Sequence, residues 1–227
     1  LTTTGAITRP NYSDSTVGAK GEFHHVQGAV IVEFEGKAFH LRHVNARSDG
    51  AFCDLDNAFF PDGSVTPCGP YEAVVFGDTH VRFVDKSVNR ATFGLGGLVE
   101  RLNPKALVFH DLLDGYAVNP HHQFKPFLAV AKFKAAFADI EDEVIEAGAW
   151  LFDRSRGRQA YVVASNHNDF LARWMSNNDW RLDPENAEFY LETALHMVRH
   201  SHMTVSGAET PDPFHYWLAK LNAENIH

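Results

Sequence analysis

From residue 71 onward, short apolar segments alternate with longer stretches of helical character, and this alternation constrains the fold more than any other feature of the chain. The apolar segments span residues 73–76, 106–109 and 160–164 and are rich in valine, alanine and aromatic side chains. Such runs are typical of buried strands. Strands that alternate with helices form parallel sheets covered by helices. The sequence therefore predicts an α/β layered fold for this part of the chain.

Two long helices are expected in the same region. Residues 124–150 carry apolar side chains at helical spacing, with lysines early and acidic residues late. A second helix is predicted from Pro184 to about His202, with Asp183 as its N-cap, because proline is favoured at the first helical position. The glycines of residues 94–97 follow no clear strand and lack the lysine–serine pair of a phosphate-binding loop. We expect them to break a helix or to form a loop on the substrate side.

The first 70 residues have a different, β-rich pattern. Residues 28–44 combine an apolar, β-branched run, a Glu35-Gly36 turn and a second, alternating run, which predicts a hairpin. Turn residues follow at 61–64, and Cys68-Gly69-Pro70 closes the region. We therefore expect a β-rich N-terminal region, residues 1–70, packed on the core of an α/β domain, residues 71–227.

Composition excludes several classes of protein. Of 227 residues, 44% are hydrophobic and 22% charged, which is typical of a globular chain rather than a disordered one. A net charge of −9 counts against a broad basic face for nucleic acid, although an enzyme can neutralise phosphate with metal ions instead. No apolar run reaches the roughly 18 residues that cross a bilayer. Two cysteines are too few for a disulfide scaffold and indicate a reducing cytoplasm. The sequence leaves open whether the protein forms a homo-oligomer.

Each predicted strand ends in polar side chains that could bind a metal ion. Asp78 and His80 lie two residues apart, so both can point the same way in an extended segment. Asp111 follows the second strand and Asn166-His167 the third. Because ligands gather beyond the carboxyl ends of strands in open α/β sheets, we expect one shared site, with donors that suit manganese, iron, zinc or nickel. Strand-end Asp and Asn also cap helices, so any one of these residues alone could be structural.

The order of these motifs resembles that of the calcineurin-like metallophosphoesterase superfamily. The pattern of that family is G-D-x-H, then G-D-x-x-D, then G-N-H and an acidic residue, matched here by residues 77–80, 111–114 and 166–167. The resemblance covers about residues 73–170. It implies a β-sandwich core flanked by helices, with the β-rich region as an N-terminal leader. The leader and the loose second and third motifs are similar to phage-encoded members that degrade DNA.

The resemblance implies a set of metal ligands. Asp78 and His80 would bind the first of two divalent metal ions. Asp111 would bridge both ions, and Asn166 would bind the second. Two cations that share an anionic ligand clamp a phosphoryl group while activating water for in-line attack. Manganese is the first expectation for the metal, with iron, zinc and nickel as alternatives.

The resemblance also implies a catalytic histidine and residues that orient it. His167 would reach the substrate as a proton donor or transition-state stabiliser. Asp114 would lie behind the ligands and orient its neighbours through hydrogen bonds, as carboxylates around metal sites commonly do. Asn168 stands where the family has an acidic residue that orients the catalytic histidine. Asp169, one place later, could take that role.

Other departures from the family pattern concern the glycines and the last motif. His110 and Ser165 replace the glycines of the second and third motifs, and His110 either crowds the turn or adds a donor there. The family's final G-H-x-H is missing: His200 and His202 have the spacing without the glycine. The simplest expectation is a domain that is incomplete at its C-terminus and lacks the last metal-binding segment.

Taken together, the motifs favour a metal-dependent phosphodiesterase, in the first place a nuclease that cleaves DNA by two-metal activation of water. A phosphomonoesterase or nucleotide phosphoesterase of the same superfamily is an alternative towards which the acidic charge leans. A non-catalytic binding or assembly module with a decayed site is another, favoured by the replaced glycines. The basic cluster of Arg154, Arg156 and Arg158 could contact a nucleic-acid backbone, although a solvated loop is the plainer interpretation.

Overall fold

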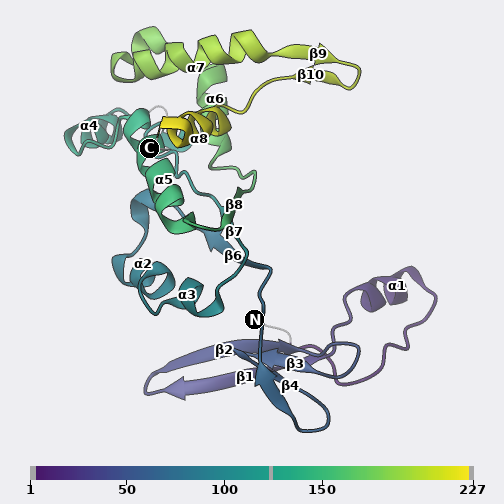
Figure 1. Cartoon of the computed structure of the whole chain (residues 1–227). Helices are drawn as coiled ribbons and strands as arrows, with labels where there is room; N and C mark the ends of the chain where they lie inside the picture. Colours follow the sequence, from purple (N-terminus) through teal and green to yellow (C-terminus); the bar gives the residue numbers. More distant parts are fainter. Residues whose placement is uncertain (1–3, 123–124, 225–227) are drawn as a thin grey trace. The chain divides into compact units, whose positions relative to one another are not determined.

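The structure is a computed structural model that describes residues 4–122 and 125–224 (Figure 1). The chain divides into two compact units, Leu1–Tyr71 and Glu72–His227. This division falls one residue after the expected end of the β-rich region. Within the described ranges, no helix is both long enough and apolar enough to cross a membrane.

The N-terminal unit is dominated by the predicted hairpin, which is confirmed. Its strands pair antiparallel over their whole length, and Gly36 makes the turn at φ +61°, a conformation that favours glycine. A short antiparallel sheet follows in the order β3-β4-β5. The elements of this unit are α1 (Thr16–Phe23), β1 (Gly28–Glu35), β2 (Ala38–Asn45), β3 (Phe52–Asp54), β4 (Asn57–Phe59) and β5 (Val65–Pro67).

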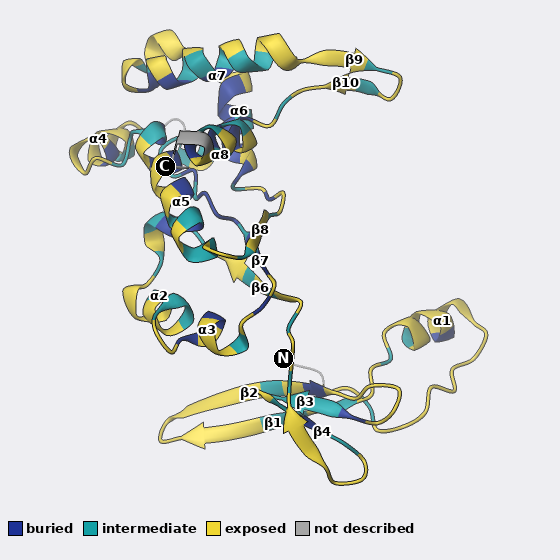
Figure 2. Cartoon of the chain, in the orientation of Figure 1, coloured by how far each residue is buried: buried dark blue, intermediate teal, exposed yellow. Residues whose placement is uncertain are grey.

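Polar contacts hold this unit together more than a large core does. Arg42 of β2 donates from Nε to Asp54 of β3 at 2.7 Å and also pairs with Glu33 of β1. Phe52 and Phe59 stack across β3 and β4 with ring centroids 5.2 Å apart. Much of the hairpin is exposed, as the yellow ribbon of β1 and β2 shows in Figure 2, and its exposed apolar side chains include Val32, Phe34, Phe39 and Leu41. The cysteines, Cys53 and Cys68, are free.

The second unit is built on the three predicted strands, which form a parallel sheet in the order β6-β7-β8. Helices connect each strand to the next, as the βαβ pattern requires. The residues 94–97 separate α2 from α3, where the Gly97 amide donates to the Gly94 carbonyl. The elements as far as the last strand are β6 (Ala73–Asp78), η1 (Val81–Phe83), α2 (Lys86–Phe93), α3 (Leu98–Leu102), β7 (Ala106–His110), η2 (Pro120–His122), α4 (Pro126–Lys134), α5 (Ile140–Ser155) and β8 (Gln159–Val162).

The core of this unit joins the central strand to helices rather than to a second sheet. Leu107 and Phe109 of β7 are fully buried, and Phe109 packs against Phe76 and Trp150 at centroid distances of 5.2 and 5.5 Å. The same buried cluster includes side chains of α5, α6, α7 and α8. The expected β-sandwich is therefore not formed by the described residues, because helices supply the apolar surface that a second sheet would have provided. The coarser expectation of a mixed α/β unit holds.

The predicted helix over residues 124–150 is in fact two helices. α4 ends at Lys134, Ala136 takes a left-handed conformation at φ +55°, and α5 begins at Ile140. Asp139 caps α5 by accepting a hydrogen bond from the Asp142 amide at 3.1 Å, which marks a true helix start. The predicted first residue, Phe124, lies outside the described residues.

The second predicted helix is shorter than expected. The chain first makes a 3₁₀ turn, η4 (Pro184–Asn186), and Asp183 accepts from the Asn186 side chain instead of capping an α-helix. His202 begins a strand rather than ending the helix, since the backbone is already extended at Ser201. The remaining elements are α6 (Asp169–Asn177), η3 (Trp180–Leu182), α7 (Ala187–His200), β9 (His202–Thr204), β10 (Gly207–Glu209) and α8 (Pro213–Glu224).

A buried hydrogen bond between α7 and α8 offers a test of this packing. Trp217 Nε1 donates to Thr193 Oγ1 at 2.8 Å, and Thr193 is fully buried. We expect Thr193→Val to lower the free energy of unfolding by about 1–3 kcal/mol, because the isosteric change leaves the indole N–H unpaired. Urea denaturation measures the effect, and Thr193→Ser, which keeps the hydroxyl, should cost less. Equal stability of the valine variant and the wild type would contradict this account of the helix pair.

Candidate metal centre

The loops that follow the three parallel strands carry the candidate site. The strands run the same way, so their carboxyl ends share one edge of the sheet, with Asp78 directly opposite His110. The pairing of β6 and β7 continues into the loops: the amides of Thr79 and His80 donate to the carbonyls of His110 and Asp111 at 3.0 and 2.8 Å. The first two sequence motifs are thereby fixed side by side.

Two residues at this edge have an unusual backbone conformation. His80 has φ +44° and Asp111 has φ +45°, both in the left-handed region that residues with a side chain rarely adopt. Such conformations cost on the order of 1–3 kcal/mol each and cluster at functional sites. The interloop hydrogen bond from the His80 amide to the Asp111 carbonyl helps to maintain both.

The first group of possible ligands consists of Asp78, His110 and Asp111. His110 Nδ1 lies 2.9 Å from Asp111 Oδ2 and 3.3 Å from Asp78 Oδ1. Of the two outcomes considered for His110, the structure shows the added donor. Ligand atoms of the three residues all lie within 4.8 Å of one another, close enough to contact one cation. Two carboxylates and an imidazole form an N/O donor set that suits first-row divalent metals.

Asp111 is the buried member of this group. Burial acts to raise its pKa, but the Ser165 hydroxyl and the nearby His110 and His167 outweigh this effect and hold the pKa below its ordinary value. The residue is only 3% exposed, yet its Oδ1 atom has no hydrogen-bond partner in the part of the chain described. A buried, ionised oxygen without a partner is costly, and a cation would satisfy it. The donor set therefore fits a divalent metal ion.

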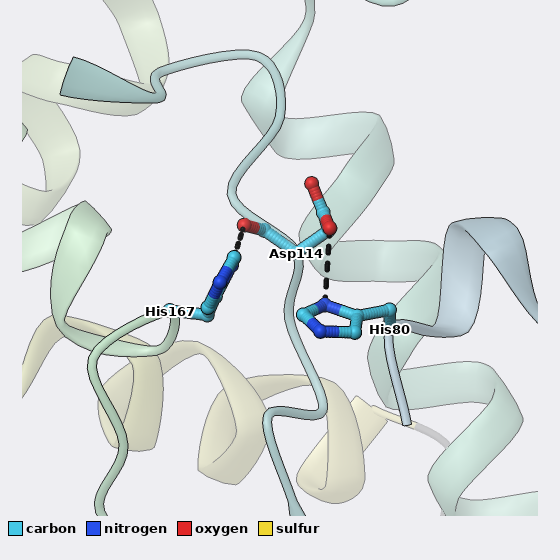
Figure 3. A group of neighbouring side chains, drawn as sticks. All are labelled: His80, Asp114 and His167. Carbon is cyan, nitrogen blue, oxygen red and sulfur yellow. Dashed lines mark hydrogen bonds and ion pairs between the residues drawn. The ribbon is translucent and has the colours of Figure 1, made fainter. Parts of the chain in front are cut away.

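The second group consists of His80, Asp114 and His167 (Figure 3). His80 Nδ1 lies 3.0 Å from Asp114 Oδ2, an ion-pair contact without hydrogen-bond geometry. His167 Nδ1 lies 2.8 Å from the main-chain oxygen of Asp114. The two imidazoles meet edge to face with centroids 4.5 Å apart. Asp114 thus contacts both histidines, one through its carboxylate and one through its backbone.

The contact with Asp114 fixes the tautomer of His167. A carbonyl oxygen can only accept a hydrogen bond, so Nδ1 of His167 must carry the proton. Nε2 is then the ring nitrogen that is left to contact a ligand. The ring is half-buried and packs against Phe170 at a centroid distance of 4.7 Å, which limits its rotation.

The structure groups the expected site residues differently from the sequence. The segment is not extended at His80, so the alternation that would align His80 with Asp78 does not apply, and its ring joins Asp114 and His167. Asn166 is exposed, and its side chain makes no hydrogen bond to any described residue. Asp169 is also exposed; it begins α6, where its amide donates to the Ser165 carbonyl.

Asn168 has a structural function that its place in the motif did not reveal. It is 6% exposed, its Oδ1 accepts from the Leu113 amide at 3.1 Å, and its Nδ2 donates to the Val163 carbonyl at 3.2 Å. It therefore fastens the loop after β7 to the end of β8. An acidic residue could not donate the second of these bonds. A polar residue directly before a helix was the only sequence signal for this role.

Two other groups, a histidine pair in α7 and the arginine cluster, lie outside the site. His196 and His200 stack on each other at 4.2 Å, and His196 stacks on Tyr216 at 3.8 Å. The arginine cluster binds its own surroundings, since Arg154 contacts Asn89 and Asp153, Arg156 contacts Asp153, and Arg158 contacts Asn103.

The role of Asn168 can be tested by two substitutions. We expect Asn168→Ala to lower the free energy of unfolding by about 1–3 kcal/mol, because the buried Leu113 amide and the partly buried Val163 carbonyl lose a partner. Asn168→Asp keeps an acceptor for the Leu113 amide and loses the donor to Val163. Chemical denaturation compares the stabilities of the variants. Asn177→Ala is the control, because Asn177 ends α6, the helix that Asn168 precedes. Wild-type stability of the alanine variant would show that these loops do not depend on Asn168.

Comparison with known proteins finds a relative in a bacteriophage. Over 195 residues the chain is 32% identical to Protein A1 of Escherichia phage T5, an alignment that covers 82% of this chain and 35% of that protein. The chain thus spans about a third of the length of the relative it matches. No protein-family model matches the chain, and no solved structure matches it. By these comparisons, the chain is similar to part of a phage protein.

Proposed function

We propose that this chain is a metal-dependent phosphoesterase that hydrolyses phosphodiester bonds, in the first place those of DNA. One observation carries the proposal: the buried Asp111 carboxylate has an unpartnered oxygen at the edge where the three parallel strands end. Around that edge the chain gathers three carboxylates and three imidazoles in two adjoining groups. Such a set exceeds what capping or turn formation requires.

The residues that would hold the metal ions come from three loops. Asp78 and Asp111, which belong to the same group, would hold one ion, and His80 and Asn166 would hold the other. His110 adds a nitrogen between the carboxylates of Asp78 and Asp111. When bound, divalent cations supply Lewis acidity towards a phosphoryl group and lower the pKa of bound water towards neutrality.

His167 would act on the substrate side. Its Nδ1 proton is held by the Asp114 carbonyl, so Nε2 is the nitrogen that can meet a phosphoryl oxygen or the leaving group. When protonated at Nε2, the ring can donate that proton to the departing oxygen. Asp114 orients the ring through its main-chain carbonyl, while its carboxylate contacts His80.

The similarity to a phage protein supports the cellular location and the substrate that we propose. A phage-encoded enzyme that degrades DNA would work in the host cytoplasm, where nucleic acid is its substrate. A metallophosphoesterase-like layering of the second unit belongs to the same proposal. The net charge of −9 favours small substrates instead, so a phosphomonoesterase or nucleotide phosphoesterase is the second candidate.

We expect the chain to degrade linear DNA in the presence of manganese, and His167→Ala to slow this by about 10²- to 10⁴-fold through loss of the proton donor. Gel analysis of DNA breakdown measures the rate. His215→Ala, which changes an exposed histidine of α8, serves as the control. Equal cleavage by wild type and His167→Ala would identify the activity as a contaminant. Turnover of p-nitrophenyl phosphate without DNA cleavage would select the second candidate.

Metal binding gives a test that does not depend on the substrate. We expect two manganese ions per chain, removed by EDTA, and binding weaker by on the order of 100-fold or more in Asp111→Asn, since even residues around metal ligands are worth about 10- to 100-fold. Titration calorimetry measures both quantities, with Asp14→Asn of the N-terminal unit as control. Fewer than one ion per wild-type chain after manganese soaking would contradict the proposal and favour the non-catalytic binding or assembly module.

A further inference from the structure

We infer that Glu143 and Lys132 are positioning residues for His167. They clamp the dipeptide Tyr116–Ala117 and thereby hold Asp114 where its carbonyl fixes the tautomer of the histidine. The inference rests on the proposed function only in taking His167 as the group that acts on the substrate. Neither residue belongs to a sequence motif, and neither touches the candidate ligands.

Glu143 satisfies two consecutive amides with one carboxylate. Its Oε1 accepts from the Tyr116 amide and its Oε2 from the Ala117 amide, both at 3.0 Å. The residue lies in α5 and is 2% exposed. A carboxylate that accepts two backbone N–H bonds in this way holds the chain like a helix cap, although no helix begins there.

Lys132 satisfies the carbonyls of the same two residues. Its Nζ donates to the Tyr116 carbonyl at 2.5 Å and to the Ala117 carbonyl at 3.4 Å, and it lies 4.7 Å from the centre of the Tyr116 ring. The residue lies in α4 and is 6% exposed. One anion and one cation, from two different helices, therefore hold every polar main-chain group of this dipeptide.

Buried charges are an expensive way to hold a loop. Burial raises the pKa of Glu143 and lowers the pKa of Lys132, so both charges are disfavoured where they stand. Apolar side chains of similar shape often serve stability equally well or better. The arrangement holds the Tyr116–Ala117 dipeptide in a single conformation, because each of its N–H and C=O groups has a defined partner.

The clamp reaches both histidines of the second group. Asp114 lies two residues before Tyr116, and its carbonyl and carboxylate contact His167 and His80. Arg82 follows His80 by two residues, and its side chain is 8% exposed. Its Nη1 lies 3.7 Å from Glu143 Oε2 and its Nε 3.1 Å from Glu146 Oε2. Glu143 thus faces the loop that carries His80 and the loop that carries Asp114.

Loss of the clamp should free the Asp114 carbonyl to turn away from His167. The proton on that ring would then no longer be confined to Nδ1. Nε2 would carry the proton in part of the molecules, and those molecules would present the substrate with a ring in the wrong tautomer. The predicted defect is one of chemistry rather than of binding.

The experiment reads the tautomer of His167 directly. Long-range ¹H–¹⁵N NMR of the imidazoles should show the Nδ1–H form in the wild type and a mixture of both forms in Lys132→Met and Glu143→Gln. Lys134→Met and Asp142→Asn, exposed neighbours on the same two helices, should leave the spectrum unchanged. Circular dichroism confirms that each variant is folded. Lys132→Met replaces the lysine by an apolar side chain of similar shape, so it keeps the test available if Glu143→Gln does not fold.

Kinetics gives the second readout. We expect kcat of phosphodiester hydrolysis to fall by about 10- to 100-fold in Lys132→Met with KM unchanged, and Lys132→Arg to restore part of it. A pure Nδ1–H signal in folded Lys132→Met would overturn the inference. If the wild type hydrolyses no phosphoester, the proposed function fails, but the tautomer measurement still decides whether the clamp positions His167.

Discussion

The main-chain pairing that continues past the ends of β6 and β7 is the constraint on which the site depends. Amides of Thr79, His80 and Val81 donate to carbonyls of His110, Asp111 and Leu112, so the two loops leave the sheet as one ladder. Ordinary loops diverge at this point. Because these do not, groups that are distant in sequence keep a fixed separation, and the third loop is attached through Asn168.

Charged residues at and near the candidate site are buried next to the apolar core. Asp111, Glu143 and Lys132 are charged groups buried beside Leu112, Leu113 and Val144, which are fully buried apolar residues. Each charged group is tolerated because main-chain or side-chain partners surround it, and Asp111 retains the one oxygen without such a partner. The apolar cluster shared by α5 to α8 buries the surface that opposes this cost.

Much of the fold could be predicted from the sequence where local pattern and tertiary environment agree. The β1–β2 hairpin and the three parallel strands follow from β-branched runs bounded by turn residues or polar ends. The single helix over residues 124–150 failed because apolar spacing continues across a break at Ala136, where a left-handed residue is not visible in the pattern. The described residues do not form the expected sandwich, and apolar strand faces do not reveal whether a sheet or helices will cover them.

The sequence could predict which loops form the candidate site, but not how their side chains are grouped. Parallel strands bring their carboxyl ends together, so motif order alone indicated which loops meet. Alternation placed Asp78 and His80 on one side, yet it assumes an extended backbone, and His80 departs from one at φ +44°. Lys132 and Glu143 were missed for another reason: charged residues in helices are usually solvated, and their partners are backbone groups of a distant segment.

The left-handed conformations of His80 and Asp111 also bear on engineering. A sequence optimised only for thermal tolerance would be drawn to glycine at both positions, since glycine adopts such angles without steric penalty. That choice would relax the backbone and delete an imidazole and the buried carboxylate together. A relaxed backbone and the candidate metal ligands therefore exclude each other at these two positions, and both residues should be kept when this protein is stabilised.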